Sequence, residues 1–133
     1  MKKLITTILS MFLFSQGLYS QPDGWSPTPN EYSSGVFMAQ ATIDGVPAEA
    51  GDWAAAFDET TGNCTGAAEL TINAGIAYIN MPIYGDDPTT NEDDGMNPGE
   101  SFIVRLWDSS TGDILEYPES FDCWYNNNGG PMY

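Results

Sequence analysis

The fold is decided by residues 68–84, AELTINAGIAYINMPIY, in which apolar and polar side chains alternate on both sides of a short turn. In the second half every other side chain is apolar, at Ala77, Ile79, Met81 and Ile83. A period of two residues is that of a strand with one buried face. Asn73, Ala74 and Gly75 predict the turn between the two halves. The stretch therefore predicts a pair of antiparallel strands, and Pro82, which has no backbone N–H, predicts that the second is an edge strand.

The same pattern extends in both directions along the chain. Apolar alternation predicts further strands at residues 36–43, 52–57, 101–108, 114–117 and 121–125, with turn-forming clusters between them. Beyond the first 20 residues, no stretch of ten or more has the spacing of an amphipathic helix. About seven short strands of this kind predict an all-β fold, an antiparallel β-sandwich over residues 35–125.

The two ends of the chain have a different composition. Lys2 and Lys3 precede an interrupted apolar run that ends near Leu18, which is typical of a signal peptide over residues 1–20 and too short for a membrane anchor. The sequence thus predicts a secreted protein, extracellular or at the cell surface. Residues 21–34 contain three prolines and predict an extended N-terminal arm. Residues 126–133, NNNGGPMY, predict a C-terminal tail that is flexible unless a partner holds it.

The charge is strongly negative. Without residues 1–20 the chain has one basic residue, Arg105, against 19 carboxylates, a formal charge of −18, and it has no histidine. Such a charge excludes nucleic acids and anionic membranes as natural partners, and it favours cations. The simpler alternative is that the acidity maintains solubility or suits a salty medium, in which screening weakens the repulsion.

The acidic residues concentrate in one predicted loop, residues 85–100, GDDPTTNEDDGMNPGE. Calcium binds six to eight oxygens in adaptable geometry, whereas zinc prefers nitrogen or thiolate ligands. We therefore predict a Ca²⁺ site, although the spacing is not that of an EF-hand. The candidate ligands are Asp86, Asp87, Thr89, Asn91, Asp93, Asp94 and Glu100, with Asp58 from the end of a neighbouring strand and, less directly, Asp52. The alternative is a solvated acidic loop with no bound ion.

Two cysteines, Cys64 and Cys123, complete the reactive groups. In an exported chain they predict a disulfide, which would restrict the unfolded state by about 4 kcal/mol for a loop of about 60 residues. The alternative is a pair of separate buried thiols. Without histidine the chain lacks the bases of serine and cysteine hydrolases. With 19 carboxylates, some pair always has the separation of a glycosidase pair, so that signal is uninformative. The residues favour a protein that is not an enzyme.

Aromatic side chains are numerous. Trp53 and Trp107 lie in predicted strands and are expected in the core. Others lie in or near the arm and the tail, where exposed rings could contact a partner subunit or a sugar. These candidate contact residues are Trp25, Tyr32, Trp124, Tyr125 and Tyr133.

Several short motifs occur in a fixed order: GDWAAAFD at 51–58, CTGA at 64–67, Asp86-Asp87 with Thr89 or Thr90, DG at 94–95, PGE at 98–100, and FIVRLWD at 102–108. Together they resemble a β-sandwich module of secreted Bacteroidetes proteins exported by the type IX route, over about residues 35–118. The resemblance implies an extracellular sandwich of adhesin-like or substrate-binding character, with no catalytic residues to carry over. Unlike those proteins, this sequence has one copy and no C-terminal sorting domain, so we expect a stand-alone subunit or a fragment.

Two functions fit these features. The first is a structural subunit of an extracellular filament or surface assembly, a homopolymer formed by strand addition or by exchange of the arm or tail. Residues 121–125 fit a donated strand better than the arm does, because the arm lacks alternating apolar residues. The alternative is a calcium-dependent carbohydrate-binding or adhesion module, with polysaccharide as its partner. The structural role is favoured, because the sequence does not group the aromatic residues on one strand face.

Overall fold

The computed structural model describes residues 21–132. The predicted signal peptide and Tyr133 lie outside the described residues. Residues 21–132 contain no helix, and consequently no helix in that range is able to cross a membrane.

The described residues contain nine strands, and several of these strands are very short. They are β1 (Ser34–Gln40), β2 (Thr42–Ile43), β3 (Val46–Pro47), β4 (Trp53–Asp58), β5 (Cys64–Glu69), β6 (Thr71–Asn73), β7 (Ile76–Tyr84), β8 (Phe102–Trp107) and β9 (Ile114–Glu116). The strand predicted at residues 76–84 has the predicted bounds. The predicted strands at 101–108 and 114–117, with the turn between them, form the β8–β9 hairpin.

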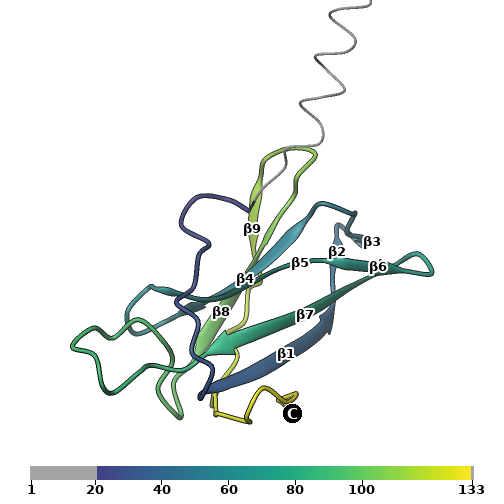
Figure 1. The fold of residues 1–133 in the computed structure, drawn as a ribbon. Coiled ribbons are helices and arrows are strands. Elements are labelled where there is room, and N and C mark those ends of the chain that lie inside the picture. Colours follow the sequence, from purple (N-terminus) through teal and green to yellow (C-terminus); the bar gives the residue numbers. More distant parts are fainter. Residues whose placement is uncertain (1–20, 133) are drawn as a thin grey trace, which may run out of the picture.

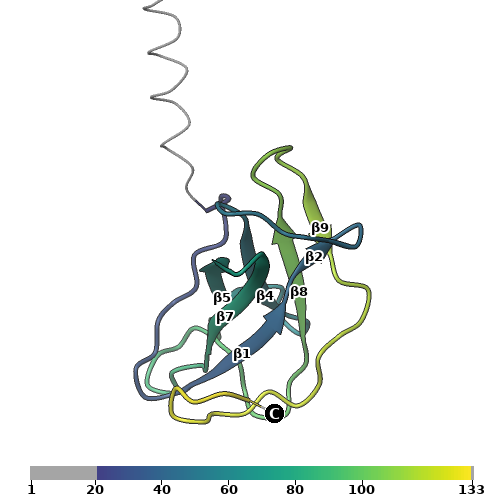
Figure 2. The ribbon, with the colours of Figure 1, turned by 90° about the vertical axis from the view of Figure 1, so that its right-hand side faces the viewer.

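The strands form an antiparallel β-sandwich, which confirms the predicted fold class. One sheet has the order β1-β7-β6 and the other β5-β4-β8-β9, with β2 and β3 as a separate small hairpin. Figures 1 and 2 show the two larger sheets facing each other, with the tail running past the start of β1. The acidic loop between β7 and β8 and the β8–β9 turn lie at opposite ends of the molecule (Figure 1).

The main core lies between these two sheets. Every second residue of β7 is buried there, and Phe102 and Val104 of β8 face it from the other sheet. The alternation therefore predicted these faces correctly, because a strand turns successive side chains to opposite sides. Phe37 and Phe121 contact Phe102 with ring centroids 5.8 and 5.4 Å away, so the core extends to the segment that leads into the tail.

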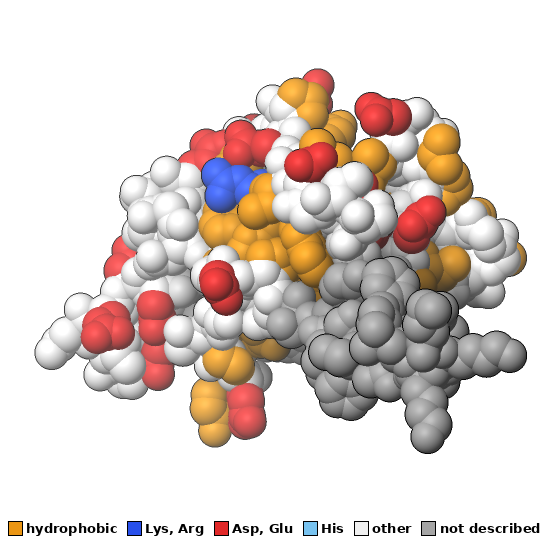
Figure 3. Space-filling view, turned by 90° about the horizontal axis from the view of Figure 1, so that it is seen from above, with side chains coloured by type: hydrophobic (Ala, Val, Ile, Leu, Met, Phe, Trp, Pro, Cys, Tyr) orange, Lys and Arg blue, Asp and Glu red, His pale blue; other side chains and the backbone are white. Residues whose placement is uncertain are grey.

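A second, smaller core covers the outer face of β4. Ala55 and Phe57 point away from the main core and are buried beneath Trp25, which is only 3% exposed. Trp25 and Phe57 pack edge to face with centroids 6.0 Å apart, and the guanidinium of Arg105 lies 4.5 Å from the Phe57 ring centre. Figure 3 shows hydrophobic side chains gathered beside this one basic group of the described residues. Residues 21–33 do run without strands, but the arm also belongs to the core.

The prediction of an edge strand at Pro82 is wrong, because β7 is the middle strand of its sheet. Pro82 lies opposite Val36, at a pair that exchanges no hydrogen bonds with β1. Its nitrogen therefore points to the other side of β7, where β6 pairs only with Ile76, Ala77 and Tyr78. The missing N–H costs no ladder bond, because the neighbouring strand has already ended.

The prediction of a last strand at residues 121–125 is also wrong. Phe121 forms a single antiparallel bridge with Phe102, and the chain then leaves the sheet. Cys123 follows with a φ of 61°, a left-handed conformation that interrupts an extended strand. Trp124 is fixed instead by backbone hydrogen bonds to Gly99 and Glu100.

Candidate functional site

The predicted metal ligands of the acidic loop mostly hold the loop's own backbone. Asp87 Oδ1 accepts hydrogen bonds from the Thr89 N–H and hydroxyl at 2.9 and 2.7 Å. These bonds hold the pKa of the Asp87 carboxyl below its usual value. Glu100 Oε2 accepts from the Asn97 N–H at 2.8 Å. Such caps use the same carboxylate oxygens that an ion would need.

Two further carboxylates of the loop, those of Asp86 and Asp93, serve different contacts. Asp86 Oδ1 accepts from the Asp94 N–H at 3.1 Å, and Asp93 Oδ1 accepts from the Asn97 amide at 3.2 Å. The Asp93 carbonyl accepts from the side-chain amide of Asn63, at 2.8 Å, so the β4–β5 turn contacts this loop. Asn91 is exposed at the outside of the loop.

Asp58 and Asp52 lie at the two ends of β4, and both are buried, at 1% and 2% exposure. Asp58 is on the side of the acidic loop, where its oxygens accept from the Thr60 N–H and the Thr61 hydroxyl. Asp52 is at the opposite end, bonded to Glu49 and Ser109. Asp52 therefore takes no part in the acidic loop, contrary to the prediction.

Two hairpin turns share one hydrogen-bonded design that the sequence analysis did not recognise. Residues 58–63, DETTGN, and 108–113, DSSTGD, both begin with an aspartate whose carbonyl accepts from the glycine N–H four residues later. Asp108 Oδ1 also accepts from the Ser110 N–H and hydroxyl, which lower the pKa of the Asp108 carboxyl. The repeated pattern D-x-[ST]-T-G was the available signal. It shows that part of the acidity stabilises turns.

Within residues 21–132, no three acidic or thiol side chains converge as the ligands of a metal ion would. An open pocket of about 380 Å³ lies between the arm, the β4–β5 turn and the acidic loop, and Glu92, Asp93 and Asp94 are on its wall. The described carboxylates thus do not fit a formed calcium site, and calcium binding stays a prediction.

The predicted disulfide is not formed in the structure. Cys64 begins β5 and packs against the outer core around Trp25, whereas Cys123 is exposed beside the tail. Both are free thiols. Burial raises the pKa of the Cys64 thiol to about 11. Export favours a disulfide, but the fold places Cys64 against the outer core and leaves Cys123 exposed beside the tail.

The predicted partner-contact aromatic residues do not form one surface. Trp25 and Trp124 are 3% and 1% exposed, so their rings belong to the two cores. Tyr32 is 87% exposed, and Tyr125 is 37% exposed near the tail. Trp53 and Trp107 were expected in the core, but they are only half-buried and pack against the outer core.

The outer edge of β1 carries backbone groups that do not face β7. The alternation of hydrogen bonds with β7 turns the backbone groups of Val36, Met38 and Gln40 outward. The Val36 N–H donates to the Gly130 carbonyl, and the Met132 N–H donates to the Val36 carbonyl, both at 2.9 Å. No described residue forms a backbone hydrogen bond with the outward groups of Met38 and Gln40.

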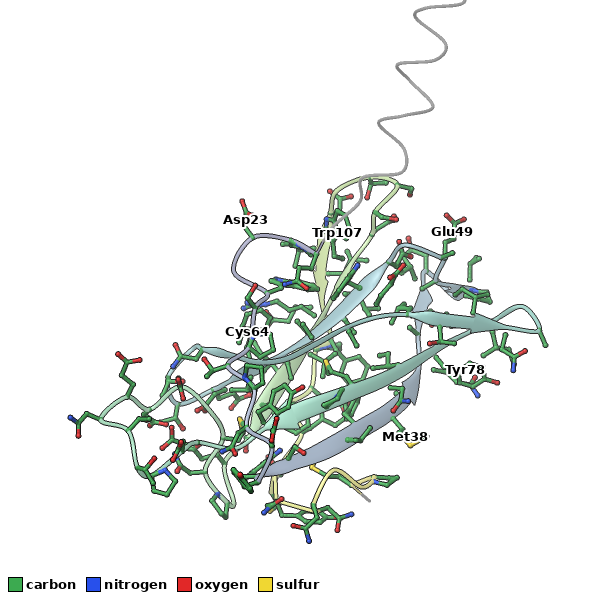
Figure 4. The ribbon with its side chains drawn as sticks, viewed as in Figure 1. Asp23, Met38, Glu49, Cys64, Tyr78 and Trp107 are labelled. Atoms are coloured by element: carbon green, nitrogen blue, oxygen red, sulfur yellow. The ribbon has the colours of Figure 1, made fainter. Side chains whose placement is uncertain are left out.

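A shallow groove runs over the outer face of the same sheet. Its volume is about 550 Å³, and its polar lining residues are Gln40, Thr71, Asn73, Tyr78 and Asn80. Met38 and Ala39 of β1 and Ile79 of β7 complete it, so no charged side chain lines it. Figure 4 labels Met38 and Tyr78 on the neighbouring strands β1 and β7.

Comparison with protein-family models, with curated proteins and with solved structures finds no match to this chain. The resemblance to the secreted Bacteroidetes module therefore stays a prediction.

Proposed function

We propose that this chain is a secreted, non-enzymatic structural subunit that assembles by β-strand addition at the outer edge of β1. The observation that carries this proposal is the open edge at Met38 and Gln40. An exposed strand edge is a template for pairing with another chain, because its N–H and C=O groups have no partner in the sheet. Export is supported by the signal-peptide pattern of residues 1–20.

The composition of the edge supports the same proposal. Residues 34–43, SGVFMAQATI, carry no charge, although Glu31 and Asp44 flank them and the chain without residues 1–20 has a formal charge of −18. Proteins usually protect an exposed edge with charged side chains or proline. Here an apolar side chain of the edge, that of Met38, is 59% exposed. An uncharged apolar edge lets a second strand approach with little electrostatic repulsion.

A charge placed on the edge tests the proposal. We expect the wild-type protein to form particles larger than the monomer, detected by light scattering and electron microscopy. Met38→Glu should raise the concentration needed for assembly by about tenfold, equivalent to about 1.4 kcal/mol, because a charge on the edge repels a second polyanionic copy. Val46→Glu is the matched control, since Val46 is 63% exposed on the separate β2–β3 hairpin.

A wild-type protein that stays monomeric at millimolar concentration would contradict the proposal. So would an equal loss of assembly in the two variants, because the effect would then come from net charge alone and not from the β1 edge.

The uncharged groove supports a second candidate function, binding of a neutral carbohydrate. Side-chain amides and hydroxyls from Gln40, Asn73 and Asn80 offer the donors and acceptors that sugar hydroxyls need, and Tyr78 offers an aromatic ring. The aromatic residues of the arm and tail that were predicted as sugar contacts do not line this groove.

Glycan-array binding with Tyr78→Ala tests the second candidate. Binding to neutral glycans that falls with Tyr78→Ala and survives Tyr32→Ala would support it. Absence of binding to any glycan on the array would exclude it, without affecting the strand-addition proposal.

A further inference from the structure

The outer edge of β9 is open, like that of β1. The Tyr117 N–H donates to the Val104 carbonyl at 2.9 Å, which fixes the alternation of hydrogen bonds between β8 and β9. Leu115 therefore faces β8, and the backbone groups of Ile114 and Glu116 point away from it. No described residue forms a backbone hydrogen bond with these outward groups. The second sheet thus ends in an unpaired edge of its own.

The side chains of this edge are apolar, and its one carboxylate is paired. Ile114, Leu115 and Tyr117 are all exposed. Glu116 Oε2 accepts a hydrogen bond from Arg105 Nε at 2.9 Å, and Arg105 is the one basic residue of the chain after residue 20. The only basic side chain of a polyanionic domain therefore neutralises the β9 edge. Exposed apolar side chains on an unpaired edge strand mark a site of association.

The outer strands at the opposite sides of the two sheets, β6 and β5, offer less. In β6 only Ile72 turns its backbone outward, because Thr71 and Asn73 are bonded to β7. In β5 the outward residues are Ala67 and Glu69, and the Glu69 side chain is exposed and charged. Of the four outer strands, β1 and β9 are therefore the two with an open stretch of backbone that carries no uncompensated charge.

We propose that the strand added to the β1 edge is β9 of a second copy. This inference rests on the proposed function and names its partner. The two open stretches match in length, because the tail already covers Val36 and leaves Met38 and Gln40, while β9 turns Ile114 and Glu116 outward. An antiparallel approach places Met38 opposite Glu116 and Gln40 opposite Ile114, and each such pair exchanges both of its backbone hydrogen bonds.

Pairing of β9 with β1 makes an open chain of subunits. The contact joins two different surfaces, so each copy receives one strand and donates another, and the series does not close at two copies. It links the four-stranded sheet of one copy to the three-stranded sheet of the next. Figure 1 shows β9 in the upper part of the molecule and β1 in the lower part, so both edges are accessible at once. Pairing of β1 with β1, in contrast, would stop at a dimer.

Complementation of two defective chains tests this pairing. Met38→Glu blocks the β1 edge and leaves β9 intact. Ile114→Pro blocks the β9 edge, because it removes an outward N–H while Leu115 stays bonded to β8. At a concentration where the wild type assembles, we expect each variant alone to be monomeric. An equimolar mixture should form a 1:1 complex in native mass spectrometry and nothing larger, because one intact β1 edge and one intact β9 edge remain.

A second donor variant guards against misfolding of Ile114→Pro. Ile114→Glu changes an exposed side chain, so it should fold, and it should raise the concentration needed for assembly by about tenfold, as Met38→Glu does. It should complement Met38→Glu in the same way. Ile72→Glu is the matched control, since Ile72 is exposed on the outer strand β6, and it should assemble like the wild type. Circular dichroism melting confirms that each variant is folded before mixing.

The outcomes separate this inference from the proposed function. If Ile114→Glu assembles like the wild type, or if both mixtures remain monomeric while the wild type assembles, β9 is not the added strand and edge addition at β1 survives. Wild-type particles that stop at two subunits would also overturn the inference, because two β1 edges would then pair with each other. If the wild type does not assemble at all, both proposals fail.

Discussion

The carboxylate of Asp52 binds Ser109 across 57 residues of sequence, accepting from its N–H at 2.9 Å and from its hydroxyl at 2.8 Å. The other oxygen accepts from the Glu49 N–H at 2.8 Å. Asp52 is 2% exposed, so one buried side chain joins the start of β4 to the turn between β8 and β9. A buried carboxylate is tolerated because three donors replace the water it has lost.

Removal of this carboxylate should destabilise the fold. In Asp52→Asn, the side-chain NH₂ group faces a backbone N–H in place of an acceptor, whichever way the amide is turned. We expect the free energy of unfolding in urea to fall by about 2–3 kcal/mol. Ser109→Ala, which removes only the hydroxyl donor, should cost about 1 kcal/mol. Equal losses from the two variants would show that the carboxylate does not act as a three-donor acceptor.

Relief of backbone strain at Cys123 should stabilise the protein. Cys123 has a φ of 61° and an exposed side chain, so its Cβ is crowded while its thiol has no buried role. Cys123→Gly should raise the free energy of unfolding by about 0.5–1 kcal/mol, since glycine adopts this conformation without steric cost. Cys123→Ala keeps the Cβ and serves as the control. A gain of the same size in both would point to the thiol and not to φ.

The two thiols should differ in reactivity with pH. Cys123 is exposed, whereas burial raises the pKa of Cys64 to about 11 from 9.0. An aromatic disulfide reagent should therefore modify one thiol rapidly near pH 8, and Cys123→Ala should abolish that rapid reaction.

Because the folded-state pKa of Cys64 is raised, the contribution of Cys64 to stability is complete below pH 9 and declines as the pH rises from 9 towards 11. Cys64→Ala should lose this alkaline decline. If the purified protein, never exposed to a reductant, reacts with none of the reagent even when unfolded, the two cysteines form the predicted disulfide instead.

Calcium should be tested directly against magnesium. The loop carboxylates accept hydrogen bonds from their own backbone, and no three acidic side chains converge within residues 21–132. We therefore expect both ions to raise the melting temperature equally at matched ionic strength. The cause would be screening of a formal charge of −18. A larger effect of calcium that Asp93→Asn removes, and that Asp113→Asn in the other turn does not, would establish the predicted site in the loop.

Local periodicity was enough to predict β7 and the buried faces of β7 and β8. The alternation at residues 76–84 gave the bounds of β7, and the faces of β8 follow from the same rule. Turn chemistry likewise predicted the β8–β9 hairpin. These features depend on neighbours in sequence, because strand pleating and turn conformation are set within a few residues.

The acidic loop shows where composition leaves the outcome open. Clustered carboxylates predict a cation, but the structure gives Asp87 and Glu100 backbone donors two or three residues away. The same oxygens serve either purpose, and the sequence does not state which partner they take. The spacing D-x-[ST] was the available sign of local capping.

By itself the sequence determined an all-β chain with a polyanionic surface and a run of uncharged residues at 34–43. Only the tertiary structure decided that Pro82 lies in a central strand, that Trp25 and Trp124 are buried, and that the C-terminal segment lies on β1. The reason is physical. A strand's pattern shows which face is buried, but its neighbours are chosen by contacts between residues far apart in sequence, and those contacts leave no local periodicity.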